Sequence, residues 1–395
     1  MNILWVKVGG LWPINIGGRL RSFHIISELA RRHKVTVITT HGPSDDPVGL
    51  ARALNGTARV RSIPYAAPKA GTLRFAVALA QSWRSPLPVD LHKWCVPDVR
   101  SAVEDELERE DIDVCVADFL HAIPNVPKEA KVPVILFEHN VESMIWKRLA
   151  DHEQGRVRHA LLSREAAKMR AAEAEAVRRS SSVIAVSDAD AAMFGENAQS
   201  IPTGVDTSYF KANGTPERPH HLVFSGAMDW FPNEDAIVYF ANEVLPTIRR
   251  EIPDVTMTVV GRNPSARLRE AAGNTGVSIT GTVPDVRPFI DEGEVYVVPL
   301  RIGGGTRLKI FEALSMGKAV VSTTVGAEGL PLEDGQHFVR ADSPNAIARS
   351  VVSLLNDAPR RRSLGSAGRQ LVNEHYSWPS VARVFEERCA AAIGH

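Results

Sequence analysis

Residues 295–317 read VYVVPLRIGGGTRLKIFEALSMG. The apolar run at the start of this segment predicts a buried strand, and the spacing of the apolar residues over 306–316 predicts a helix. Between them, the glycines at 303–305 allow the backbone to approach a ligand closely. Free amides at the start of a helix favour an anion, and a strand, a glycine-rich loop and a helix in this order are typical of phosphate sites in α/β sheets.

Two cations lie at the first turn of the predicted helix. Arg307 and Lys309 oppose the helix dipole, so they favour a bound anion that offsets this cost. We therefore predict that the segment binds a diphosphate. Two other interpretations remain open. Lys309 could instead pair with Glu312 on the helix surface, or the glycines could form a flexible loop without a ligand.

The same alternation of strands and helices continues along the chain. Strands are predicted at 2–8, 35–39, 114–117, 134–137, 183–186, 222–226, 255–260, 277–279, 295–298 and 319–322. Helices are predicted at 19–33, 157–179, 234–251, 306–316, 344–356 and 378–393. This order predicts an α/β fold with two tandem parallel sheets, joined by the polar linker KANGTPERP at 211–219. Ligands are expected at the carboxyl ends of the strands, in a groove between the two domains.

Composition and charge exclude several classes of protein. The 395 residues include 46 Lys or Arg and 46 Asp or Glu, so the chain lacks the basic excess of a nucleic-acid binder. The three cysteines have neither metal-ligand nor redox spacing, and no metal is expected. The N-terminus lacks the layout of a signal peptide, and no apolar run approaches the ~20 residues of a membrane span. We therefore expect a cytoplasmic protein.

Positive charge is concentrated in residues 1–100, which hold 14 Lys or Arg against 5 Asp or Glu. This surface faces phosphates, an anionic membrane or only solvent. Within it, residues 67–94 interleave apolar side chains such as Phe75 and Trp83 with basic ones such as Arg74 and Arg84. The pattern is typical of a helix that contacts anionic lipid, and also of a helix that packs into the core.

A second candidate site follows the strand predicted at 134–137. His139 lies directly after it, beside Asn140, and its imidazole can bind a sugar hydroxyl or a phosphate oxygen, unless it is only structural. Glu138 and Glu142 are candidate bases, although Glu142 can also serve as a helix cap or an ion-pair partner.

Glycines also follow the first strand. Gly17 and Gly18 let this loop approach an acceptor or donor phosphates. They do not form a complete GxGxxG, and the second strand ends in TTH without an acidic residue, which argues against a dinucleotide oxidoreductase. The adjacent His220 and His221 are interpreted as solvated residues near the linker.

Together these motifs resemble the family 4 glycosyltransferases of the GT-B fold, over nearly the whole chain. The resemblance is carried by Gly17-Gly18, EHNVE at 138–142, AVS at 185–187, IPTGVD at 201–206, VVGR at 259–262, GTVPD at 281–285 and the segment 299–317. GAMDW at 226–230, followed by Pro232 and Asn233, is similar to bacterial sugar transferases of exopolysaccharide gene clusters.

The resemblance implies two Rossmann-like domains that face each other across a cleft. They are residues 1–210, joined by the C-terminal helix at about 378–395, and residues 211–377. It implies a catalytic role for His139 beside the donor sugar and a ribose contact for Glu312, and we add Arg307 and Lys309 as catalytic candidates from their place at the helix start. The implied donor-binding residues are Gly17, Gly18, Gly226, Arg262, Val283, Gly304, Gly305, Thr306, Leu308 and Glu312. Asn140 and Glu142 are candidate contacts to the acceptor or the sugar.

The chain departs from the family pattern at the donor site. Gly304 stands where the family has an acidic residue that contacts the donor sugar. Ala227 and Asn233 stand where the family has an arginine and a lysine directed at the diphosphate. We infer that Arg307 and Lys309 supply the missing positive charge.

The activity that the resemblance implies is that of a retaining hexosyltransferase. It would move a sugar from a nucleotide diphosphate sugar to a sugar or lipid-linked acceptor, in polysaccharide or glycoconjugate biosynthesis. No cofactor, metal or nucleic-acid partner is expected. We do expect peripheral contact with the inner face of an anionic membrane. Two alternatives remain open: a nucleotide-sugar epimerase of the same fold, and a two-domain solute-binding protein.

Overall fold

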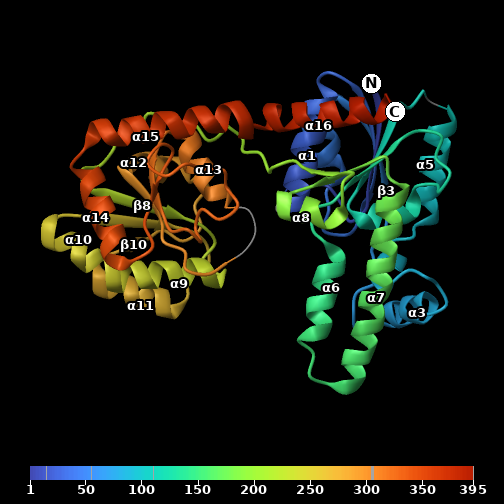
Figure 1. Cartoon of the computed structure of the whole chain (residues 1–395), viewed down its shortest axis with the longest axis horizontal. Coiled ribbons are helices and arrows are strands. Elements are labelled where there is room, and N and C mark those ends of the chain that lie inside the picture. The colour runs from blue at the N-terminus through green and yellow to red at the C-terminus, as the bar shows by residue number, and fades with distance from the viewer. Residues whose placement is uncertain (15, 55, 110, 304–306, 395) are drawn as a thin grey trace. The chain divides into compact units, whose positions relative to one another are not determined.

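The computed structural model describes residues 1–14, 16–54, 56–109, 111–303 and 307–394. The chain divides into two compact units (Figure 1). The first is Met1–Pro202 together with the chain from Val381 onward, and the second is Thr203–Ser380. Each unit contains a parallel sheet with helices packed on it, so the predicted α/β class with two sheets is confirmed. The sequence analysis places the domain boundary between residues 210 and 211, whereas the chain passes from the first compact unit to the second between Pro202 and Thr203.

In the part of the chain that the structure describes, the first sheet has seven parallel strands in the order β3-β2-β1-β4-β5-β6-β7. These are β1 (Asn2–Lys7), β2 (Lys34–His41), β3 (Ala58–Pro64), β4 (Val114–Asp118), β5 (Val134–Phe137), β6 (Ser182–Ala185) and β7 (Ala198–Ser200). The chain winds one way from β1 to β3 and the other way from β4 to β7. This places a topological switch point between β1 and β4, where open α/β sheets bind their ligands at the carboxyl edge.

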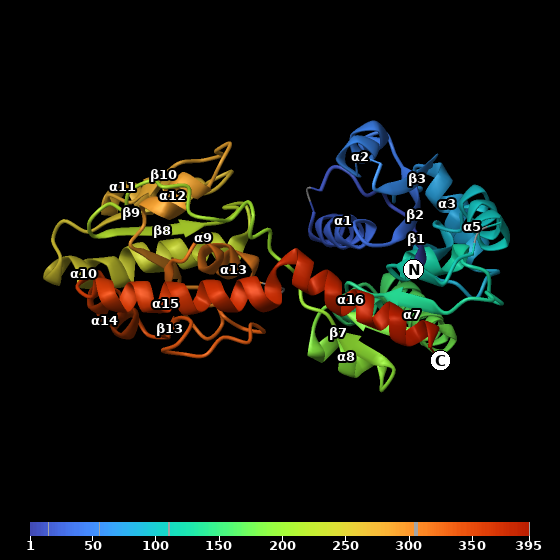
Figure 2. The same ribbon diagram turned by 90° about the horizontal axis from the view of Figure 1, so that it is seen from above.

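Helices connect the strands of the first sheet. They are α1 (Gly17–Ala30), α2 (Pro47–Leu54), α3 (Leu73–Ser82), α4 (Val89–His92), α5 (Pro97–Arg109), the 3-10 helix η1 (Leu120–Asn125), α6 (Glu142–Asp151), α7 (Arg156–Arg179) and α8 (Asp188–Phe194). The final helix of the chain, α16 (Trp378–Ile393), also packs on this unit. Its Phe385 ring lies 5.3 Å from Trp5 and 5.2 Å from Phe137, and Glu386 pairs with Arg32 at 2.6 Å. Both ends of the chain therefore lie in the first unit (Figure 2).

Among the described residues, the second sheet has six parallel strands in the order β10-β9-β8-β11-β12-β13. These are β8 (His221–Ser225), β9 (Thr256–Val260), β10 (Ser278–Ile279), β11 (Val295–Val298), β12 (Ala319–Ser322) and β13 (Val339–Arg340). Its switch point lies between β8 and β11. The helices are α9 (Phe231–Tyr239), η2 (Phe240–Val244), α10 (Leu245–Glu251), α11 (Ala266–Thr275), α12 (Arg287–Glu292), α13 (Leu308–Ser315), α14 (Pro344–Leu355), α15 (Ala358–Leu371) and η3 (Val372–Tyr376).

One predicted helix is interrupted. The stretch 234–251 is not continuous but consists of α9, the π-helical turn η2 and α10. Pro246 has no amide hydrogen to donate within the ladder, which accounts for the change of register at this point.

The edge strands β3, β7 and β13 escaped prediction, unlike the edge strand β10, because none of the three contains a continuous buried apolar run. In β3, Ala58 and Ile63 are buried while Arg59 and Arg61 reach the surface, so no continuous apolar run exists. The edge strands β7 and β13 are short and contain polar residues. Central strands of a parallel sheet are buried on both faces and are read more easily from sequence.

The interpretation of His221 as a solvated residue is wrong. Its side chain is 1% exposed at the start of β8, and its Nδ1 lies 2.7 Å from Thr256 Oγ1. Burial lowers the pKa of His221 to about 4, so the imidazole is neutral near pH 7. His221 thus serves the packing of the second sheet.

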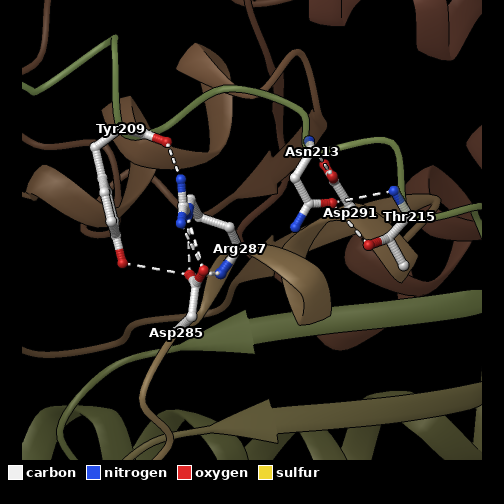
Figure 3. Close-up of polar contacts among 6 residues, drawn as sticks. All are labelled: Tyr209, Asn213, Thr215, Asp285, Arg287 and Asp291. Atoms are coloured by element: carbon white, nitrogen blue, oxygen red, sulfur yellow. Dashed lines mark hydrogen bonds and ion pairs between the residues drawn. The ribbon is translucent and has the colours of Figure 1, made fainter.

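The polar stretch after residue 202 is bound to the second unit rather than free (Figure 3). Arg287 pairs with Asp285, and its guanidinium lies 4.0 Å from the centre of the Tyr209 ring and donates to the Tyr209 carbonyl at 3.1 Å. Further along, the backbone N–H of Asn213 donates to Asp291 Oδ2 at 2.7 Å. The segment predicted as the linker, 211–219, therefore belongs to the second unit.

No helix in the described ranges combines the length and the apolar character needed to cross a bilayer.

Candidate active site

The switch point of the first sheet holds an ion pair. Lys7 ends β1 and Asp118 ends β4, and these neighbouring strands place Lys7 Nζ 3.3 Å from Asp118 Oδ1. Lys7 is 2% exposed and Asp118 is completely buried. Burial lowers the pKa of Lys7, although the Asp118 carboxylate opposes this change. Burial alone would raise the pKa of Asp118, but Lys7 and His139 bring it down to about 2, so this carboxyl stays ionised.

His139 joins this pair from the loop after β5. Its Nε2 lies 2.9 Å from Asp118 Oδ1, and its ring stacks on Phe119 with the ring centres 3.8 Å apart. Burial lowers the pKa of His139 to about 4, with Asp118 acting in the opposite direction. The imidazole is therefore neutral near pH 7. Because Nε2 then donates its hydrogen to the carboxylate, Nδ1 is left as a hydrogen-bond acceptor.

The start of α1 lies beside this acceptor nitrogen. A Cβ added to Gly18 would come within 2.6 Å of the Phe119 ring and 3.7 Å of His139 Nδ1, whereas a Cβ on Gly17 would meet open space. Gly18 is thus the glycine that the close approach requires. The N-cap residue Ile16 provides no side-chain cap, and the first turn has no acidic residue. Free amides at this end favour an anionic or hydroxyl-bearing ligand.

Two pockets open at this edge of the first sheet. A pocket of about 230 Å³ is walled by Lys7, Gly18 and Phe119 among others. A larger one, about 620 Å³, shares Gly9 and Trp94 with it. The larger pocket is lined by aromatic side chains and two carboxylates: Tyr65, Phe75, Trp94, Trp146, Asp45 and Asp90. A mostly apolar wall with a few polar groups is typical of small-molecule sites.

The other candidates near His139 take different positions. Glu138 is 1% exposed, and burial together with the nearby Glu173 and Glu142 raises its pKa well above the usual value. Because this shift favours the protonated form, and because Glu138 Oε2 already accepts the Leu120 backbone N–H at 3.2 Å, Glu138 is a poor candidate for the base. Asn140 donates to Glu142 at 3.5 Å, and Glu142 also lies on the wall of the smaller pocket.

In the second unit, two loops meet at the carboxyl edge of the sheet. A Cβ on Gly261, which follows β9, would lie 1.8 Å from the carbonyl oxygen of Gly226, which follows β8. The loops therefore pack backbone against backbone. A Cβ on Gly226 would lie 2.7 Å from both Asn233 Nδ2 and Lys309 Nζ. These close approaches bring residues from two loops and from the helices α9 and α13 together near the switch point.

Lys309 projects from α13 toward the Gly226 loop. Its Nζ donates to Asn233 Oδ1 at 2.6 Å and lies 4.2 Å from the centre of the Phe224 ring. Burial lowers the pKa of Lys309 to about 7 and raises that of Glu312 to about 7, while each partly offsets the shift of the other. Lys309 is thus hydrogen-bonded to Asn233, rather than paired with Glu312 on the helix surface. A bound anion would favour its charged form.

Arg307 is the N-cap residue of α13 and is only 3% exposed. Its Nη2 donates to the Val325 carbonyl at 3.4 Å and lies 3.9 Å from a Glu328 carboxylate oxygen. A Cβ on Gly303 would lie 3.3 Å from the same Nη2. Leu308, partly buried, is the first residue of α13. The predicted donor residues Gly304, Gly305 and Thr306 lie outside the described residues.

The remaining predicted donor residues lie at the same edge. Arg262 follows β9, and its Nε is 3.4 Å from Asp229 Oδ2 in the loop after β8. Val283, partly buried, lies on the loop after β10. The described donor candidates of the second unit are thus carried by the neighbouring strands β10, β9 and β8 and by α13.

Sequence reasoning missed two residues at these sites, Lys7 and Asp118, and one contact, the hydrogen bond between Lys309 and Asn233. A charged residue at the end of an otherwise apolar strand was a usable signal for Lys7 and Asp118, because such an end lies at the ligand edge of a parallel sheet. The pairing of Asn233 with Lys309 has no local sequence signal.

Comparison with known proteins identifies relatives over most of the chain. The model of Glycosyltransferase Family 4 matches residues 17–209, and that of Glycosyl transferases group 1 matches residues 219–357. A phosphatidyl-myo-inositol mannosyltransferase of Mycobacterium tuberculosis is 29% identical over 210 residues, which are 49% of this chain and 54% of the relative. An uncharacterized 44.6 kDa protein in the cps region of Klebsiella pneumoniae is 24% identical over 42% of this chain and 45% of its own length. The chain thus matches about half the length of these curated relatives.

Solved structures resemble the whole chain. Anabaena HepE in complex with UDP superposes with a TM-score of 0.66 and 16% identity, covering 99% of this chain and 100% of the other. The crystal structure of TarM gives a TM-score of 0.66 at 11% identity, covering 100% and 99% of the two chains. WaaG, a glycosyltransferase involved in lipopolysaccharide biosynthesis, gives 0.60 at 17% identity, covering 99% and 100%. At these identities the similarity concerns the fold.

Proposed function

Because this chain belongs to the family 4 glycosyltransferases and has the GT-B fold, we propose that it transfers a sugar from a nucleotide diphosphate sugar to an acceptor, with retention of the anomeric configuration. The product would be a polysaccharide or glycoconjugate. The observation that carries the proposal is the convergence of Lys309, Asn233 and Gly226 beside the start of α13. Relatives named as mannosyltransferases and a fold neighbour that binds UDP support it.

The second unit is proposed to hold the donor. Lys309, Arg307 and the first amides of α13 would balance the charge of its diphosphate. Since the diphosphate gains negative charge as the glycosidic bond breaks, these groups would stabilise the departing anion in the transition state. The Glu312 carboxylate, when ionised, can accept both ribose hydroxyls.

His139 is proposed to contact the donor sugar. Its neutral ring offers Nδ1 as an acceptor next to Gly18, so it suits a sugar hydroxyl better than a phosphate oxygen, which has no hydrogen to donate. Asp118 and Phe119 fix the ring through one hydrogen bond and one stacking contact. Asp118 is thus a positioning residue for this contact.

Retention is proposed from the family likeness and from the carboxylates at the first site. Glycosyl transfer passes through an oxocarbenium-like transition state. Asp118 is already engaged by Lys7, Trp5 and His139, and Glu138 is buried with its pKa raised well above the usual value. Neither is poised as a nucleophile or base. The leaving diphosphate would then take the acceptor proton, and the acceptor oxygen would bond to the anomeric carbon on the face that the diphosphate leaves.

The test begins with a thermal-shift panel of nucleotide diphosphates, because a ligand at a hundredfold excess over its Kd stabilises the native state by ~2.7 kcal/mol. The matching nucleotide sugars are then incubated with sugar and lipid-linked acceptors. Acceptor-dependent release of nucleotide diphosphate, with an unchanged anomeric configuration in the product by NMR, supports the proposal. An isomerised donor formed without acceptor would indicate the epimerase, and tight binding without turnover would indicate a solute-binding protein.

His139→Ala is expected to lower kcat/KM about tenfold, as befits the loss of one hydrogen bond of ~0.5–1.5 kcal/mol. The exposed His152 provides the matched control, and His152→Ala should leave kcat/KM unchanged. Donors that each lack one sugar hydroxyl identify the hydroxyl that His139 contacts. With the donor that lacks this hydroxyl there is no contact to lose, so wild type and His139→Ala should use it equally well. If wild type and variant discriminate against every deoxy donor to the same extent, the assigned contact does not exist.

Donor binding is expected to weaken as the pH rises above 7. The pKa of Lys309 is about 7 in the free protein, whereas a bound diphosphate favours the charged amine and raises that pKa. Binding therefore takes up a proton, and the affinity for the nucleotide sugar should fall by up to about tenfold per pH unit between the two pKa values. Calorimetry in buffers of different ionisation enthalpy measures this uptake. Lys309→Arg, which stays charged, should remove it, and an unchanged uptake in that variant would assign it to another group.

A further inference from the structure

Three helices of the first unit form a common projecting face. Helices α6 and α7 make an antiparallel hairpin that extends beyond the sheet, with α3 beside it (Figure 1). Lys168 on α7 donates to the carbonyl of Ser82 at 2.6 Å, and Arg164 donates to that of Trp83 at 3.2 Å. These bonds fix the end of α3 against α7. We call the surface of residues 69–84 and 142–170 the hairpin face.

Apolar side chains on the hairpin face are exposed rather than packed. Leu73 is 82% exposed and Val157 76%. Seven of the fifteen large hydrophobic side chains that the described chain exposes lie on this face, namely Leu73, Val77, Trp83, Ile145, Leu149, Val157 and Leu161. On each helix a pair is spaced four residues apart and so forms a stripe. The interpretation of α3 as a helix packed into the core is therefore wrong, since the side chains it buries are those of Ala78 and Ser82.

The charge of the hairpin face is strongly positive, although the whole chain is neutral. Residues 69–84 and 142–170 contain ten Lys or Arg and four Asp or Glu. Two of the four acids, Glu142 and Glu165, are buried, and Glu153 pairs with Arg158 at 3.3 Å. The exposed cations are Lys69, Arg74, Arg84, Lys147, Arg148, Arg156, Arg158, Arg164 and Arg170. Basic side chains flanking an exposed apolar stripe are the pattern of a helix at the surface of an anionic bilayer.

The hairpin face also leads to the candidate active site. The larger pocket at the sheet edge is lined by Lys69 and Phe75 from the α3 region and by Trp146 from α6. Through Gly9 and Trp94 it adjoins the smaller pocket beside Lys7 and Gly18. The headgroup of a lipid lying in the bilayer could therefore enter the larger pocket while its apolar part stays in the membrane.

We propose that the hairpin face docks on an anionic phospholipid surface and presents the larger pocket to the headgroup of a lipid-linked acceptor. Docking itself is independent of the proposed sugar transfer, and only the identity of the headgroup as acceptor rests on it. Each cation near the surface strengthens binding by roughly fivefold, and apolar insertion adds to this. Attachment is then reversible and weakens as salt shortens the screening length.

The test is sedimentation of the full chain with vesicles of phosphatidylcholine alone and of phosphatidylcholine mixed with phosphatidylglycerol. The anionic vesicles should bind at least tenfold more strongly at low salt. The charge variant Arg74→Glu/Arg148→Glu/Arg156→Glu should lower that binding to the level seen with neutral vesicles. The apolar variant Leu73→Ser/Leu149→Ser/Val157→Ser should lower it severalfold. All six side chains are exposed, so folding should be kept, and the melting temperature checks this.

Matched controls come from elsewhere on the first unit. Arg52→Glu/Arg109→Glu/Lys128→Glu reverses three exposed charges, and Val48→Ser/Met193→Ser removes two exposed apolar side chains. Both should bind anionic vesicles like wild type. Equal binding to neutral and anionic vesicles, or equal losses in controls and test variants, would overturn the proposal. So would a dimer in light scattering that only the apolar variant dissociates, or binding to heparin without binding to vesicles.

Nucleotide release from donor with a water-soluble acceptor is measured on the same variants. Vesicle binding without any sugar transfer would refute the proposed function and leave the docking surface standing. Sugar transfer without vesicle binding would refute the docking surface alone.

Discussion

Lys309→Ala should lower turnover at saturating donor by about a hundredfold or more. The amine of Lys309 is fixed by Asn233 at 2.6 Å, beside the position that a Cβ on Gly226 would occupy, and it projects from a helix start with no acidic residue in its first turn. If a diphosphate departs here, the variant loses a charge that acts mainly in the transition state. Removing one such group typically costs roughly 2.7–4 kcal/mol.

Arg307→Ala should lower turnover more than tenfold. The variant also tests whether such a loss comes from the missing charge or from a destabilised fold. Because Arg307 is buried and donates to the Val325 carbonyl, its loss can also destabilise the loop. The melting temperature of each variant is therefore measured beside single-turnover kinetics. Arg349→Ala, which removes an exposed cation on α14, is the matched control and should behave like wild type. Near-wild-type turnover in folded Lys309→Ala and Arg307→Ala would show that the diphosphate binds elsewhere.

Gly261→Ala should destabilise the second unit more than most single substitutions. Its Cβ would lie 1.8 Å from the Gly226 carbonyl oxygen, which belongs to backbone and cannot rotate away. Relief requires the loops after β8 and β9 to separate, although Gly226 donates to the Val260 carbonyl and Met228 to that of Arg262, both at 2.9 Å. We expect a loss of about 3 kcal/mol, at the upper end of overpacking costs. The melting temperature should fall by roughly 6–12 °C.

The same substitution should also weaken nucleotide binding, because separation of the loops moves Gly226 away from Lys309. Calorimetry with the nucleotide diphosphate measures this effect. Gly273→Ala on α11 is the matched control: its added Cβ meets no atom within 4 Å, and a helical alanine is favoured over glycine by ~0.5–1 kcal/mol. If Gly261→Ala melts and binds like wild type, the contact between the two loops does not position the site.

Local sequence was sufficient for the elements whose pattern is self-contained. The central strands β5, β11 and β12 have the predicted bounds, because residues buried on both faces form continuous apolar runs. The helices α7 and α16 were likewise identified to within a residue. The two cations after β11 were correctly placed at a helix start because strand, loop and helix are contiguous in the chain, and the binding of an anion there stays a prediction.

Exposure was decided by the tertiary structure. The apolar residues of α3 have the same spacing whether the helix lies in the core or on the surface. Leu73 and Val77 are exposed here because α3 lies beside a helical hairpin that projects past the sheet. The burial of His221, interpreted from its polar neighbours as solvated, has the same origin: β8 is a central strand of its sheet.

The sequence by itself determined the fold class, the family and the cations of the second unit, because each depends on residues close together in the chain. Only the tertiary structure decided what those residues touch. Lys7 and Asp118 are far apart in sequence and meet because β1 pairs with β4 at the switch point. Asn233 reaches Lys309 because α9, the helix after β8, and α13, the helix after β11, flank the other switch point. The position of a contact between distant residues follows from strand order, which no local pattern encodes.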